Sequence, residues 1–156
     1  MNNTNPYDLI IPNLYLGSIK ALDIKKCESE SESESNSISF YMVVDLIKHT
    51  IVLPNTTSKA QIYINLPVHD SPDECEKLLS LIRETQVLEK MHDCIIKGQP
   101  VLVHCFVGMQ RSCALVACYL INYHHMTPNE AIDYIKTKRP IAFFGQVNFM
   151  ETLNNI

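Results

Sequence analysis

Short apolar runs, rich in β-branched and aromatic residues, recur along the chain and predict strands. Pro12 divides the first run, which therefore predicts one or two short strands. The last run is continuous and apolar, as is typical of a buried central strand in a parallel sheet. The four runs are residues 9–18 (LIIPNLYLGS), 40–46 (FYMVVDL), 61–67 (QIYINLP) and 100–105 (PVLVHC).

Helical segments separate these predicted strands. Residues 71–74 (SPDE) and 127–130 (TPNE) each have a hydroxyl residue, a proline and a glutamate at the spacing of a capping box. One long helix, or two helices, should follow the first box as far as Lys97, and the second box should open a helix to Lys138. Strands alternating with helices predict an α/β fold with a central, mainly parallel sheet flanked by helices. The other predicted helices are residues 19–26, 111–123 and 146–153.

A run of alternating glutamate and serine, residues 27–37 (CESESESESNS), interrupts this pattern. Its composition cannot bury an apolar face, so we expect a flexible acidic surface loop at about residues 27–38. An acidic docking segment or a cluster of kinase sites is the alternative interpretation. The chain of 156 residues is long enough to bury one core, which predicts a single domain over residues 1–156.

Composition excludes several classes of function. The net charge of −4 argues against nucleic-acid binding and against binding to a membrane surface, and no apolar run is long enough to cross a bilayer. The six cysteines are scattered without a Cys-x-x-Cys pair, so we expect no structural metal. The polar N-terminus does not resemble a signal peptide, which places these thiols in a reducing compartment, the cytoplasm or also the nucleus.

The segment VHCFVGMQRSC carries the candidate chemistry. Cys105 directly follows His104, Arg111 stands six positions later, and Gly108 lies midway. If a strand ends near His104 and a helix begins near Arg111, the loop between them lies at the carboxyl end of a strand and the amino end of a helix. Successive N–H groups then point into one concavity, where the helix dipole adds positive charge and Gly108 permits the turn. Such a loop is predicted to bind an anion.

The residue types in this loop indicate phosphoryl transfer. The amides and Arg111 would favour the thiolate form of Cys105, which is a nucleophile toward phosphorus. The planar guanidinium of Arg111 can bind two phosphate oxygens and stabilise the transferring group. Ser112 is placed to donate a hydrogen bond to the sulfur when it leaves, and His104 to shape the loop. The alternative, a buried cysteine beside an incidental arginine, is less favoured because the chain has only three arginines.

Phosphoryl transfer to Cys105 also requires an acid that protonates the leaving oxygen and later activates water. Asp70 follows the strand predicted at residues 61–67 and precedes a capped helix, so it should lie at the same edge of the sheet. Asp73 is the competing candidate, although a place in the first helical turn suits a dipole role. Asp45 within a strand and Asp93 within a helix are weaker candidates.

With these residues assigned, the sequence resembles a small atypical dual-specificity phosphatase, a cysteine-dependent member of the protein tyrosine phosphatase superfamily. The resemblance covers most of the chain and implies a protein tyrosine phosphatase-like fold. It implies Cys105 as nucleophile, Arg111 as phosphate clamp, Asp70 as general acid and then base, and Ser112 as leaving-group helper. It also implies no metal and no organic cofactor. The motifs that carry it are IIPNLYLGSIKAL, VVDL, INLPVHDSP, VLVHCFVGMQRS and RPIAFFGQVNFMETL.

Two departures from the family pattern affect the site. Gln110 stands before Arg111, where these enzymes often carry a serine or another small residue. The Pro-Asn that follows the family's Arg-Pro element is missing, and Asn148 precedes Phe149 instead. We expect four loop residues to shape the rim of the substrate site together with Gly108 and Arg111: Phe106, Val107, Met109 and Gln110.

The resemblance predicts an enzyme that removes phosphate from tyrosine and from serine or threonine in phosphorylated proteins. One alternative is a phosphate-binding adaptor without turnover, which intact Cys105, Arg111 and Asp70 argue against. Another is the same chemistry on a phosphoinositide or on an RNA 5′-triphosphate. The loop has no lysine, and the chain has no excess of basic residues, so both of these substrates are less favoured.

Overall fold

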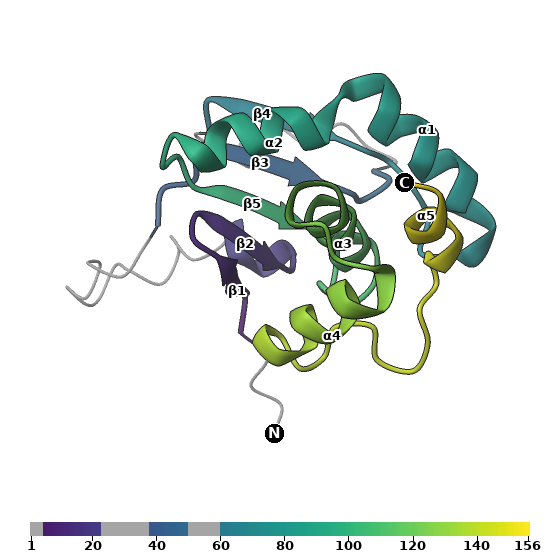
Figure 1. Cartoon of the computed structure of the whole chain (residues 1–156). Helices are drawn as coiled ribbons and strands as arrows, with labels where there is room; N and C mark the ends of the chain where they lie inside the picture. The colour runs from purple at the N-terminus through teal and green to yellow at the C-terminus, as the bar shows by residue number, and fades with distance from the viewer. Residues whose placement is uncertain (1–4, 23–37, 50–59) are drawn as a thin grey trace.

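The computed structural model describes residues 5–22, 38–49 and 60–156, and in these ranges five strands form one sheet in the order β1-β2-β5-β3-β4 (Figure 1). The strands β1 and β2 form an antiparallel hairpin, whereas β2, β5, β3 and β4 pair in parallel. The predicted mainly parallel sheet is confirmed, and the apolar strand β5 lies at its centre. The strands are β1 (Tyr7–Ile11), β2 (Leu14–Gly17), β3 (Met42–Asp45), β4 (Ile62–Asn65) and β5 (Val101–His104).

The helices pack mainly against one face of this sheet. In Figure 1, α3 is seen nearly end-on next to the end of β5, while α4 lies beside α3 and α5 packs between α1 and α3. Residues 112–120 of α3 are all buried, as expected for a core helix. The helices are α1 (Cys75–Thr85), α2 (Val87–Ile96), α3 (Arg111–His124), α4 (Pro128–Lys138) and α5 (Met150–Asn155), with two short 3₁₀ helices, η1 (Ile19–Leu22) and η5 (Pro72–Glu74). None of the described helices is long and apolar enough to cross a membrane.

Local sequence signals explain most helix boundaries. Two helices, rather than one, precede β5, because Gln86 adopts a left-handed conformation with φ of 56° between α1 and α2. The predicted capping box of α4 is confirmed: Glu130 N–H donates to Thr127 Oγ1 at 3.1 Å, and Thr127 N–H donates to Glu130 Oε1 at 2.9 Å. The helix predicted from residue 146 begins at Met150. The Glu/Ser run, residues 27–37, lies outside the described residues.

The capping box predicted at residues 71–74 was wrong. Ser71 Oγ accepts from Asp73 N–H at 3.2 Å and opens the 3₁₀ helix η5. The Glu74 carboxylate accepts from the backbone N–H of His69 at 3.0 Å instead of returning to Ser71. Glu74 therefore stabilises the turn that carries Asp70 rather than the start of α1.

The two faces of the sheet bury different side chains. Apolar residues of α1 to α5 and of the sheet form the main core on the helical face. On the opposite face, Val43 and Leu102 pack with Ala21, next to the rings of Tyr7, Tyr15 and Phe40, which meet edge to face at 5.4–5.6 Å. Side chains alternate along a strand, so Asp45 and His104 follow Val43 and Leu102 on this second face. Two polar groups are thus placed behind the loop that follows β5.

Candidate active site

The candidate loop connects the central strand to the most buried helix. Strand β5 ends at His104, and α3 begins at Arg111, as the sequence predicted. Cys105 N–H donates to the carbonyl of Gly17 at the end of β2, at 3.4 Å. Residues 105–110 therefore leave the sheet at the carboxyl end of its parallel strands, where α/β folds place their ligands.

The backbone carbonyls of residues 106–110 all accept hydrogen bonds from surrounding structure. The donors come from η1, α3 and the segment after α4. Since these carbonyls are engaged outside the loop, the peptide planes turn their N–H groups toward its interior. The bonds are Ile19 N to Phe106 O (3.2 Å), Arg139 Nη2 to Val107 O (3.2 Å), Arg139 Nε to Gly108 O (2.8 Å), Phe143 N to Met109 O (2.7 Å) and Ala114 N to Gln110 O (2.8 Å).

The inward N–H groups form an anion cradle around the thiol. Gly108 N–H donates to Cys105 Sγ at 3.3 Å. Within the described ranges, the backbone N–H groups of residues 106, 107 and 109–111 donate to no protein acceptor. Free N–H groups that converge at the start of a helix attract anions.

Gly108 is required by the shape of this cradle. Its φ is +78°, in the region where only glycine is unstrained. A Cβ at this position would lie 2.6 Å from the carbonyl oxygen of Gly17 and 2.7 Å from Arg139 Nη2. Both the backbone conformation and the lack of space therefore explain the glycine.

Ser112 lies against the thiol in the first turn of α3. Cys105 Sγ and Ser112 Oγ are 3.2 Å apart, and both side chains are buried. The hydroxyl can donate to a thiolate at this distance. The structure thus brings together the two residues that the sequence assigned to the nucleophile and to its leaving step.

Arg111 is oriented by two carbonyls from other loops. Its Nη1 donates to Val68 O at 3.2 Å and to Leu46 O at 3.5 Å. Its Nε is buried and has no partner among the described residues. A buried donor without a partner is costly, and a phosphate oxygen in the cradle would satisfy it.

The bond from Arg111 to Val68 also places the candidate acid. Asp70 is exposed two residues after Val68, and its Oδ1 accepts a hydrogen bond from Asn148 Nδ2 at 2.8 Å. Asp73 lies in η5, where its backbone N–H is bound to Ser71. The loop that carries Asp70 thus contacts Arg111, the predicted phosphate clamp, which favours Asp70 over Asp73 as the candidate acid.

His104 lies behind the loop in a polar cluster on the second face of the sheet. Its Nδ1 is 3.3 Å from the carbonyl of Cys105, and its Nε2 is 4.0 Å from Asp45 Oδ1. Burial lowers the pKa of His104, although the Asp45 carboxylate opposes this effect. His104 is therefore neutral at pH 7 and contacts the loop backbone.

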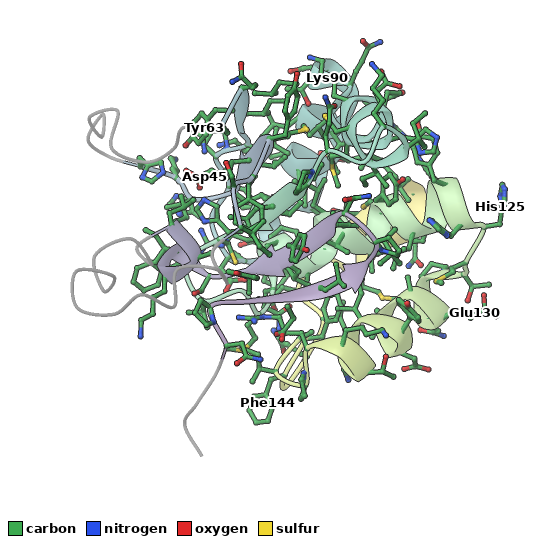
Figure 2. All side chains as sticks on the ribbon, turned by 90° about the vertical axis from the view of Figure 1, so that its left-hand side faces the viewer. Asp45, Tyr63, Lys90, His125, Glu130 and Phe144 are labelled. Atoms are coloured by element: carbon green, nitrogen blue, oxygen red, sulfur yellow. The ribbon has the colours of Figure 1, made fainter. Side chains whose placement is uncertain are left out.

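Asp45 is the centre of that cluster. It accepts hydrogen bonds from Tyr63 OH at 2.5 Å and from Ile47 N–H at 2.8 Å, and His49 Nε2 lies 2.7 Å from it. Figure 2 shows Asp45 and Tyr63 next to one another. Burial and the nearby carboxylate raise the pKa of Tyr63, so its phenol remains a donor. Sequence analysis considered Asp45 only as a weak candidate acid, and its bonds indicate a supporting position instead.

Arg139 is a site residue that sequence analysis missed. Its side chain is fully buried, and besides the two loop carbonyls it binds Asp8 Oδ2 at 2.8 Å and Asn5 O at 2.9 Å through Nη1. It therefore joins the back of the cradle to the N-terminal hairpin. The scarcity of arginine was the available signal, because Arg139 is one of three in the chain.

The rim residues divide into two groups. Phe106 and Val107 are exposed (59% and 43%), as expected for a rim, and Met109 is half-buried. The prediction that Gln110 shapes the rim was wrong, because its side chain is only 5% exposed. Its Nε2 donates to Gln146 O at 2.6 Å, and its Oε1 accepts from Asn148 N–H at 3.0 Å. Gln110 thus supports the neighbouring segment instead of forming the rim.

A Cys-x5-Arg loop between a central parallel strand and a helix defines the class of cysteine-dependent phosphatases. The family model for the catalytic domain of dual specificity phosphatases matches residues 14–156, so the chain belongs to that family. Among the described residues, no group of three or more His, Cys, Asp or Glu is arranged to hold a metal ion.

Known relatives share both the sequence and the fold. Dual specificity protein phosphatase 1 of Arabidopsis thaliana is 30% identical over 138 residues, which are 88% of this chain and 63% of the relative. Human dual specificity protein phosphatase 14 is 31% identical over 96 residues, 62% of this chain and 46% of the relative. The chain thus spans less than two thirds of either protein. The crystal structure of human DUSP28 has a TM-score of 0.75 at 22% identity and covers 97% of this chain and 92% of its own, which shows a common fold.

Proposed function

We propose that this chain is an active protein phosphatase that hydrolyses phosphotyrosine and phosphoserine or phosphothreonine through a phospho-cysteine intermediate. The observation that carries the proposal is the anion cradle: Gly108 N–H and Ser112 Oγ contact the Cys105 thiol, and the N–H groups of residues 106, 107 and 109–111 in the same loop have no acceptor among the described residues. A phosphate held there lies directly against the nucleophile.

In the first step, the Cys105 thiolate attacks phosphorus. The Sγ–P bond forms as the P–O bond to the substrate breaks, and Asp70 gives its proton to the departing oxygen. Arg111 and the cradle amides bind the three equatorial oxygens, on which negative charge is spread in the transition state. Arg111 Nε is an available donor because it has no partner among the described residues.

In the second step, water hydrolyses the phospho-cysteine. The Asp70 carboxylate, left ionised by the first step, takes a proton from the attacking water. The new P–O bond forms as the Sγ–P bond breaks, and the Ser112 hydroxyl donates to the departing sulfur from 3.2 Å. Inorganic phosphate leaves, and Cys105 returns to its thiolate form.

A phosphorylated protein is the substrate class that the site supports best. The exposed rim is apolar at Phe106 and Val107, and the loop carries no lysine to bind the further phosphates of a phosphoinositide or an RNA 5′-triphosphate. The net charge of −4 also disfavours a nucleic-acid partner. We further propose a cytoplasmic location, which would keep Cys105 reduced.

The test compares hydrolysis of a phosphotyrosine peptide, a phosphothreonine peptide, a phosphoinositide and an RNA 5′-triphosphate. We expect turnover of the two peptides and none by Cys105→Ser, which should still bind phosphopeptide in calorimetry. Cys94→Ser is the matched control, since Cys94 lies in α2 and its thiol contacts Met42 Sδ at 4.0 Å. Turnover by Cys105→Ser would refute the mechanism, and phosphopeptide binding by an inactive wild-type protein would support the adaptor alternative.

A further inference from the structure

We propose that Asn148, held in place by Gln110, is a positioning residue that directs the proton of Asp70 toward the leaving group. The inference deepens the proposed function and rests on it. Both residues depart from the family pattern in the sequence, and the structure shows that they contact one another: Asn148 N–H donates to Gln110 Oε1 at 3.0 Å. The two departures therefore form one local arrangement.

The orientation of the Asn148 amide is fixed by two hydrogen bonds. Its Nδ2 donates to Asp70 Oδ1 at 2.8 Å, and its Oδ1 accepts from Gln146 Nε2 at 2.5 Å. An ionised carboxylate only accepts hydrogen bonds, so the NH₂ end of the amide must face Asp70. Gln146 favours the same orientation from the opposite side, because an amide nitrogen can donate only to the oxygen end of Asn148.

The backbone of Asn148 is anchored to both sides of the site. Gln110 immediately precedes Arg111. The Nε2 of Gln110 also donates to Gln146 O at 2.6 Å, so the segment of residues 146–148 is fixed to the loop that carries Cys105. On the other side, Cys75 Sγ donates to Asn148 O at 3.4 Å, which connects it to the start of α1. A serine or alanine at position 110 would be too short to make these bonds.

The Asp70 side chain needs such a support because the residues of its own loop do not fix its orientation. It is exposed, and within the described residues Asn148 is the only group that hydrogen-bonds to its carboxylate. An exposed side chain otherwise exchanges rotamers within nanoseconds. One charge-assisted bond to a fixed partner restricts that motion.

The bond also selects which carboxyl oxygen carries the proton. Because Oδ1 of Asp70 accepts from Asn148, the proton of the acid form resides on Oδ2. Oδ2 is then the atom that protonates the departing oxygen and later takes a proton from water. Asn148 touches neither the substrate nor the reacting atoms, so it acts only through Asp70.

The test uses a series of aryl phosphates with leaving groups of increasing basicity. Asn148→Ala should lower kcat about tenfold for phenyl phosphate and a phosphotyrosine peptide, a fraction of the ~10²–10⁴-fold that general acid catalysis supplies. It should change kcat little for a phosphate with a very acidic phenol as leaving group, which departs without a proton. Gln110→Ala should give the same pattern, and it supplies a second variant if Asn148→Ala folds poorly.

A double-mutant comparison separates positioning from a general structural role. In an Asp70→Ala background, Asn148→Ala should have no further effect on any substrate. Asn155→Ala is the matched control, since among the described residues the side chain of Asn155 donates only to Glu151 O within α5, and it should not change the leaving-group dependence. Equal losses on every substrate, or a further loss in the Asp70→Ala background, would overturn the inference. A wild-type protein without activity on any aryl phosphate would refute the proposed function itself.

Discussion

Arg139 Nε donates to the carbonyl oxygen of Gly108 at 2.8 Å, although the two residues are 31 positions apart. The guanidinium is fully buried and meets a carboxylate, Asp8, on its far side. It uses a planar fork of donors, which the single ammonium of a lysine cannot reproduce. The shape of the cradle therefore depends on a residue that does not contact the bound anion.

Arg139→Lys should lower both stability and phosphate binding. Lysine keeps the charge but cannot make all four hydrogen bonds of the guanidinium. Each buried acceptor left without a partner costs about 1–3 kcal/mol, so we expect a clear drop in the urea midpoint and weaker binding of inorganic phosphate. Arg83→Lys is the control, because Arg83 is exposed and, among the described residues, hydrogen-bonds only to Asn155 O. If the two variants unfold at the same urea concentration, Arg139 does not hold the loop.

Gly108→Ala and Gly98→Ala separate backbone strain from steric conflict. The two glycines have φ of 78° and 76°, but an added Cβ meets atoms within 3 Å only at Gly108. Both variants should lose about 1–2 kcal/mol of stability from the left-handed conformation. Only Gly108→Ala should also lose phosphate binding in calorimetry. Loss of binding in both variants, or in neither, would contradict the steric account.

Ser112→Ala should slow the second chemical step more than the first. A hydrogen bond to a charged group contributes about 1.5–3 kcal/mol, so steady-state turnover should fall roughly tenfold to a hundredfold. Rapid-quench kinetics should show a burst of phenol release, and mass spectrometry should detect phosphorylated Cys105. A linear time course without a burst would place Ser112 outside the leaving step.

His104→Asn should change how stability depends on pH. Burial lowers the pKa of His104 from its ordinary 6.5, so below about pH 6.5 the unfolded chain takes up a proton that the folded protein does not. The unfolded state then binds more protons, and the wild-type protein loses stability as the pH falls. The difference in urea midpoint between wild type and variant should therefore narrow from pH 7.5 to pH 5.5. A constant difference would show that His104 does not contribute to the pH dependence.

The features that the sequence predicted correctly depend on residues that are close together along the chain. The central strand, the turn at Gly108 and the start of α3 at Arg111 follow one another directly, so the loop could be placed without knowledge of the fold. The contact between Asn148 and Asp70 joins residues 78 positions apart, and no spacing rule predicts it. Gln110 was misjudged for the same reason, because a residue in a loop can turn its side chain to either side and only tertiary packing decides which.

The prediction of a full capping box at Ser71 was wrong for a different reason, although Ser71 does cap η5. Its sequence satisfies the capping-box pattern, but the Glu74 carboxylate has a competing donor in the backbone of His69. That donor is available only because the preceding loop folds back, as the bond from Arg111 to Val68 shows. The hydrogen bond from His69 to Glu74 therefore replaces the bond that the local capping pattern predicted.

The cradle draws its hydrogen bonds from widely separated parts of the chain: Ile19 near its start, Ala114 in its middle, and Arg139 and Phe143 near its end. A nascent polypeptide still missing residue 139 would contain the complete Cys-x5-Arg motif yet lack Arg139 and Phe143, which make three of the five hydrogen bonds that turn its amides inward. Phosphate affinity should therefore arise late in synthesis and all at once. A time course of vanadate binding during translation would record the completion of the fold itself.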